Sequence, residues 1–113
     1  MNAAVKKAFK QEMGLAKVLY QQRDFEQAFH HLERAHILGQ CYVIPHTISH
    51  WWMLKVGWQC QDNREIRGQL LRIAGSLVLS RIWVPLGNTG GANVSPVQPM
   101  PIPDDLKLLL DVK

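Results

Sequence analysis

Before residue 84, apolar side chains recur three or four positions apart in four successive stretches, which is the spacing of amphipathic helices. We expect helices over residues 3–21, 25–38 and 45–61, and a fourth that begins after residue 63. The connections between them are short, so consecutive helices should run antiparallel. The sequence therefore predicts an all-α, four-helix domain built from two antiparallel helical hairpins.

Turn-forming residues mark the ends of these expected helices. Asp24 can cap the second helix by accepting a backbone hydrogen bond, and Gly39 is placed to end it. Pro45 suits the first turn of the third helix, because its fixed φ is helical and its missing N–H is not needed there. Asp62 and Glu65 have the spacing of a capping box at the start of the fourth.

The third expected helix is apolar on almost every side. It contains three of the four tryptophans, Trp51, Trp52 and Trp58. A helix that is apolar all round is typical of a protein interior. We therefore expect this helix to be buried and its tryptophans to belong to the core.

The composition changes after Val84. Residues 85–103 contain five of the six prolines, so regular structure is not expected there. Acidic residues at 104–105 then open a short terminal helix, whose apolar face consists of Leu106, Leu109 and Leu110. We expect this tail to fold back over the bundle, because an exposed apolar helix is unfavourable.

The length of the chain, 113 residues, allows one hydrophobic core and is too short for two. We expect a single domain over residues 1–113, in which residues 84–113 wrap a helical bundle formed by residues 1–83. The net charge of +4 comes from scattered basic residues, which argues against a nucleic-acid surface. There is no apolar run of membrane-spanning length, no secretory signal and no cysteine framework, so we expect a cytoplasmic protein without membrane contact.

All five histidines lie in the first half of the chain, and three of them border the turn between the second and third helices. His46 and His50 are one helical turn apart, a spacing that lets two imidazoles reach one metal ion. Glu33 and His36 have the Glu-x-x-His spacing of metal-binding helical bundles. Because an antiparallel hairpin brings the two pairs together, we expect Glu33, His36, His46 and His50 to form a mononuclear site for zinc, iron or copper.

These histidines can instead be structural, since a histidine near a helix C-terminus or beside a carboxylate is stabilised without a metal. The chain would then be a non-catalytic protein–protein interaction module, with the helical hairpin, Val97–Pro103 and the terminal helix facing a partner or a second copy. Catalysis is supported by no motif. The glycine string at 87–91 lacks the Lys-Ser/Thr of a phosphate loop, and Cys41 is expected to be a buried, inert thiol.

The first two expected helices resemble a single tetratricopeptide repeat. The residues that carry the resemblance are Leu15, Ala16, Leu19, Asp24, Phe25, Ala28, Leu32 and Ala35. The sequence departs from the repeat at Arg23, where glycine is usual. A single repeat implies a helical hairpin and no peptide-binding solenoid, because at least three repeats are normally needed.

Four strings spread over the chain resemble a family of small bacterial proteins known as domain of unknown function 3703. They are ERAHILGQ at 33–40, HTISHWWML at 46–54, GNTGGA at 87–92 and PMPIPDDL at 99–106. The resemblance covers nearly the whole chain. It implies a bacterial, soluble protein and no particular activity.

Overall fold

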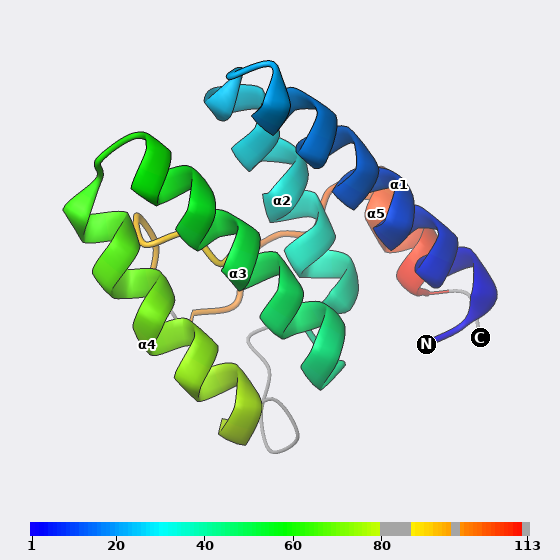
Figure 1. The fold of residues 1–113 in the computed structure, drawn as a ribbon. Coiled ribbons are helices and arrows are strands. Elements are labelled where there is room, and N and C mark those ends of the chain that lie inside the picture. Colours follow the sequence, from blue (N-terminus) through cyan, green and yellow to red (C-terminus); the bar gives the residue numbers. More distant parts are fainter. Residues whose placement is uncertain (80–86, 96–97, 112–113) are drawn as a thin grey trace.

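The computed structural model describes residues 1–79, 87–95 and 98–111, and within these ranges it contains five helices and no strand (Figure 1). The helices are α1 (Ala3–Gln21), α2 (Phe25–Gly39), α3 (Val43–Gln59), α4 (Asn63–Leu79) and α5 (Asp104–Leu110). α1 packs on α2, α3 packs on α4, and α2 joins the two hairpins by packing on α3. The predicted all-α fold of two helical hairpins and a short terminal helix is confirmed.

Part of the expected organisation lies outside the described residues. This applies to the end of the predicted 1–83 bundle, with Trp83, and to residues 84–86, 96–97 and 112–113 of the predicted wrapping segment. None of the described helices is long and apolar enough to span a membrane.

Side-chain caps fix the starts of three helices. Asn2 Oδ1 accepts a hydrogen bond from the backbone N–H three residues later at 2.8 Å, and Asp24 and Asp62 do the same at 3.3 Å and 3.1 Å. Each cap satisfies one of the N–H groups that have no partner in the first turn of a helix. The predicted cap at Asp24 is therefore present. Asp62 caps α4, but the predicted capping box is not completed, because the Glu65 carboxylate accepts from Gln69 and Ala92 and the Asp62 N–H donates to the Gly57 carbonyl.

The boundary between α2 and α3 differs slightly from the prediction. Gly39 is the last residue of α2 and not the residue after it. A Cβ at Gly39 would lie 2.8 Å from Pro45 Cβ and 3.1 Å from the Phe9 ring, so the close approach of three helices requires glycine here. α3 begins at Val43, two residues before Pro45. Pro45 still lies in the first turn, where it removes no helical hydrogen bond.

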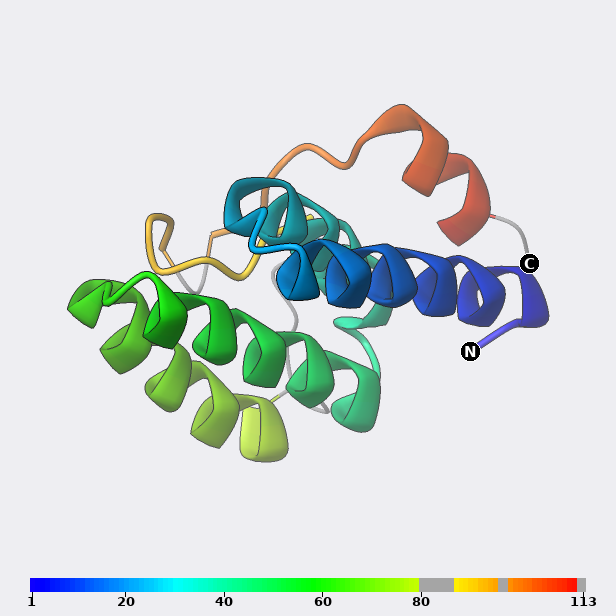
Figure 2. The same cartoon turned by 45° about the horizontal axis from the view of Figure 1, so that its top comes forward.

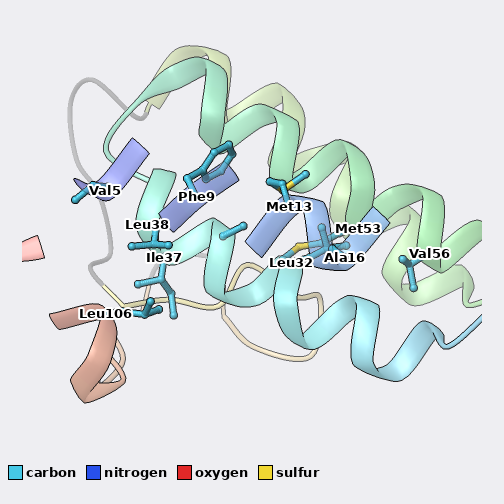
Figure 3. Close-up of a cluster of buried hydrophobic side chains, with 11 residues drawn as sticks. Val5, Phe9, Met13, Ala16, Leu32, Ile37, Leu38, Met53, Val56 and Leu106 are labelled. Atoms are coloured by element: carbon cyan, nitrogen blue, oxygen red, sulfur yellow. The ribbon is translucent and has the colours of Figure 1, made fainter. Parts of the chain in front are cut away.

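The hydrophobic core lies where α1, α2 and α3 meet, and α5 covers one end of it (Figures 2 and 3). Its buried members are Val5, Phe9, Met13, Ala16, Leu32, Ala35, Ile37, Leu38, Met53, Val56 and Leu106. Arg34 on α2 binds Glu12 on α1 at 2.8 Å and also pairs with Asp105 on α5. The terminal helix is thus attached by a buried leucine and an ion pair.

The expectation that α3 is buried all round is wrong. Trp51 and Trp58 are 53 % and 68 % exposed, and only Trp52 packs inward, against Tyr20 of α1. One side of α3 packs on α1 and α2 and a second side packs on α4, which leaves a third side open to solvent. Periodicity cannot reveal this, because it shows which residues are apolar and not how many neighbours a helix has. Cys41 is likewise exposed and not buried as predicted.

Residues 87–95 pass beside α2 and along the inner side of the α3–α4 hairpin (Figures 1 and 2). The Gly87 N–H donates to Gln40 Oε1 at 3.1 Å, which attaches the segment to the end of α2. The Ala92 N–H donates to Glu65 Oε2 at 2.9 Å, and Arg72 donates to the Val94 carbonyl at 2.8 Å. These side-chain bonds hold an irregular segment against two helices.

Leu106→Ala should destabilise the fold by about 2–4 kcal/mol, because it removes a 1 %-exposed side chain and leaves a cavity between α5 and the core. The matched control is Leu108→Ala on the same helix, where the side chain is 73 % exposed and the expected change is below about 0.5 kcal/mol. Urea unfolding measures both. Equal effects of the two variants would show that α5 does not contribute its leucine to the core.

Candidate metal centre

The Nε2 atoms of three histidines converge on one point between α2 and α3. The Nε2 of His36 lies 2.9 Å from that of His46 and 3.1 Å from that of His50, and the remaining pair is 3.0 Å apart. His36 is in the last turn of α2, and His46 and His50 are one turn apart near the start of α3. The α2–α3 turn therefore assembles the three rings, as the spacing predicts.

The backbone of the glycine string determines which nitrogen of His36 carries the proton. His36 Nδ1 lies 2.7 Å from the carbonyl oxygen of Asn88. A carbonyl can only accept, so Nδ1 must be the protonated nitrogen of a neutral imidazole. The Nε2 of His36 then has a free lone pair directed at the other two rings.

The side-chain amide of Gln69 determines which nitrogen of His50 carries the proton. His50 Nδ1 lies 2.6 Å from Gln69 Oε1. The orientation of this amide is not arbitrary, because Gln69 Nε2 donates to Glu65 Oε2 at 2.7 Å and to the Gly90 carbonyl at 2.8 Å. With its nitrogen facing two acceptors, Gln69 presents its oxygen to His50, which must donate from Nδ1. The Nε2 of His50 is therefore also unprotonated.

The Nε2 atoms of His36 and His50 cannot form a hydrogen bond with each other, because neither carries a hydrogen. Both Nε2 atoms carry lone pairs, yet they lie 3.1 Å apart in a buried site. His46 can relieve only one of its own two contacts by donating from Nε2. Its Nδ1 is buried and has no hydrogen-bond partner. A cation between the three nitrogens would convert these unfavourable contacts into ligand bonds.

Burial keeps the three imidazoles neutral. It lowers the pKa of His46 to about 4 and that of His50 to about 3, and His46 lowers the latter further by charge repulsion. The pKa of His36 is well below its ordinary value for the same reason, with repulsion from the other two rings adding to the effect of burial. Metal ions bind the neutral form of imidazole. Near pH 7 all three side chains are thus in the form that binds a metal.

Glu33, the fourth predicted ligand, does not join this cluster. Among the described residues, the side chains with ligand atoms all within 4.8 Å of one another are His36, His46 and His50. Glu33 instead lines a cleft of about 420 Å³ together with Glu65 and Phe29. Burial raises the pKa of Glu33, and the Glu65 carboxylate raises it further. Glu33 lies one helical turn before His36, at the cleft and not at the histidine cluster.

The residues that orient the rings were not identified from the sequence. Gln69 on α4 lies 19 positions after His50, and Asn88 acts through its main chain, so neither leaves a recognisable spacing. The glycine string at 87–91 is visible in the sequence, but nothing in it indicates a contact with His36. Gly90 has a φ of +86°, and a Cβ there would lie 2.7 Å from His36 Nε2. Only the folded structure shows that this string packs against His36.

The remaining histidines lie elsewhere. His31 Nδ1 is 2.6 Å from Glu12 Oε2, in the contact between α1 and α2, and His30 is exposed. Neither belongs to the cluster.

Comparison with known proteins identifies the family. The chain matches the family described as "Protein of unknown function (DUF3703)" over residues 3–110 and belongs to it. This confirms the resemblance seen in the four strings, of which two carry the histidines and a third contains Gly90. No curated protein and no solved structure matches the chain.

The metal-free protein should lose stability as the pH falls from about 6.5 to 4. The unfolded chain binds protons on its histidines near pH 6.5, whereas the folded chain resists them until about pH 4 at His46, so the folded state is disfavoured throughout this window. One such histidine contributes about 2 kcal/mol. Urea unfolding in the presence of a chelator measures the effect, with the exposed His30→Asn as control. An unfolding free energy that is the same at pH 7 and pH 4.5 would contradict the neutral buried cluster.

Proposed function

We propose that this member of the DUF3703 family binds one transition-metal ion through the Nε2 atoms of His36, His46 and His50. The single observation that supports this most strongly is the pair of forced tautomers. The Asn88 carbonyl and Gln69 Oε1 each accept a hydrogen bond from the Nδ1–H of one histidine, so the Nε2 lone pairs of these two histidines face each other at 3.1 Å. A metal-binding histidine typically donates a hydrogen bond from its other ring N–H to a carbonyl or carboxylate oxygen in this manner.

The ligand type narrows the choice of metal. Imidazole nitrogen suits zinc, copper, iron and nickel, whereas calcium and magnesium prefer oxygen. Cys41 and Cys60 are exposed and outside the cluster, and Met53 Sδ already accepts a hydrogen bond from Gln69 at 3.4 Å. A thiolate site for soft ions is therefore not favoured. Zinc, iron and copper remain the proposed ions.

A purely structural role for the histidines is the alternative. In that case each close nitrogen pair should share a proton, as buried polar groups normally do. Two of the three rings are committed to protonation at Nδ1, so the His36–His50 pair cannot. The arrangement therefore favours a metal over a metal-free polar cluster.

Metal content is the test of this function. Untagged protein is incubated with zinc, copper or iron(II), freed of excess metal, and analysed by plasma mass spectrometry. We expect about one equivalent per chain in the wild type, and at least a tenfold loss in His46→Ala/His50→Ala. The matched control is His30→Ala/His31→Ala, which should keep its metal. Wild-type protein that retains none of the three ions would refute the proposal.

Glu33→Gln completes this series, because the sequence alone includes Glu33 among the ligands. The group of close ligand atoms among the described residues consists of His36, His46 and His50, so we expect this variant to bind metal with unchanged stoichiometry. A loss as large as that of the histidine double variant would restore Glu33 to the ligand set.

A separate observation favours a second role, that of self-association. Large apolar side chains of α3 and α4 face solvent, and these are Ile44, Ile48, Trp51, Trp58, Leu70, Leu71 and Leu77. Together they offer on the order of 800 Å² of surface, which is what each partner contributes to a standard interface. We propose a second copy of this chain as the occupant, because the four α3 side chains form one apolar stripe that can pack on its own symmetry mate.

Sedimentation velocity over a range of protein concentrations tests this role. We expect a dimer that Trp51→Gln/Trp58→Gln converts to monomer, while Leu108→Gln, exposed on the distant α5, leaves the dimer intact. A wild-type chain that is monomeric at every concentration excludes self-association.

A further inference from the structure

We infer that the three histidines hold the ion on one face only, and leave three adjacent coordination positions to exchangeable small ligands such as water, hydroxide or a small anion. This inference rests on the proposed metal site and says what kind of site it is. A structural site is closed by four protein ligands, whereas a reactive or ligand-binding site keeps positions open.

The spacing of the nitrogens supports facial binding. The three Nε2 atoms form a nearly equilateral triangle with sides of 2.9, 3.0 and 3.1 Å. With metal–nitrogen bonds of about 2.1 Å, nitrogens at this separation subtend about 90° at the metal. A tetrahedral ion needs about 3.4 Å between its ligand nitrogens, and a planar three-coordinate ion needs more. The triangle therefore matches one face of an octahedron.

The protein offers no further strong ligand to fill the opposite face. Among the described residues the close group contains three histidines and no carboxylate or thiol. The remaining stretches, 80–86, 96–97 and 112–113, contain no His, Cys, Asp or Glu in their sequence. Gln69, which contacts His50, already uses its oxygen for His50 and its nitrogen for Glu65 and Gly90.

Gly90 lets the loop backbone lie directly against the His36 ring. A Cβ at this position would lie 2.5 Å from His36 Cδ2 and 2.7 Å from His36 Nε2, so a side chain there would displace the ring itself. At this position the site is therefore bordered by main-chain atoms alone. His36 and His50 are 3 % and 2 % exposed, whereas His46 is only partly buried. Solvent, the ion and a small ligand therefore reach the site past His46.

Cobalt(II) substitution followed by azide titration tests the inference. Six-coordinate cobalt has weak visible absorption bands and four-coordinate cobalt has intense ones, so the coordination number is read directly. We expect weak bands in the wild type that shift and intensify in a saturable way when azide is added. His30→Ala/His31→Ala, which lies outside the cluster, should give the wild-type spectrum and the same response to azide.

The possible failures are distinct from one another. Protein that takes up no cobalt, or that gives the same spectrum in the His46→Ala/His50→Ala variant, overturns the metal site itself. Stoichiometric cobalt with intense bands before azide is added, or with bands that azide does not change, overturns the open facial site and leaves metal binding intact.

Discussion

The buried amide of Gln69 is the interaction on which the arrangement of this protein depends. It is fully shielded from solvent, so each of its hydrogen bonds must be made within the protein. Its oxygen accepts from His50 on α3, and its nitrogen donates to Glu65 on α4 and to the carbonyl of Gly90. A shift of α3, of α4 or of the glycine string would leave a buried polar group without a partner. One side chain thus couples the helical hairpin to the irregular segment.

The histidine cluster extends the hydrophobic core into a polar site. Met53 belongs to the core and also accepts a hydrogen bond from Gln69, so apolar packing and the polar network share a boundary. The same burial that supports packing also keeps the imidazoles neutral and places their lone pairs in a low-dielectric setting. Such a cluster is strained without an ion, and an ion bound only by the folded chain stabilises the fold. The proposed metal binding would therefore stabilise the folded chain.

Two faces of α3 have opposite properties. The inner face contributes His46, His50 and Met53 to the site and the core, and the outer face exposes Trp51 and Trp58. Self-association through the outer face would restrain the helix that carries two of the three ligands. The proposed interface and the proposed metal site are therefore connected through one rigid element.

The sequence by itself determined the helices, and through them much of the site. Caps at Asp24 and Asp62, apolar periodicity and a four-residue spacing at His46 are local signals, because a helix is stabilised mainly by neighbours within a turn or two. Only the tertiary structure decided that Glu33 faces another cleft, that Trp58 is exposed, and that Asn88 meets His36 from 52 positions away. These outcomes depend on which elements cover each helix face. No local pattern encodes that choice, since it is made by long-range packing and by the hydrogen bonds that buried groups require.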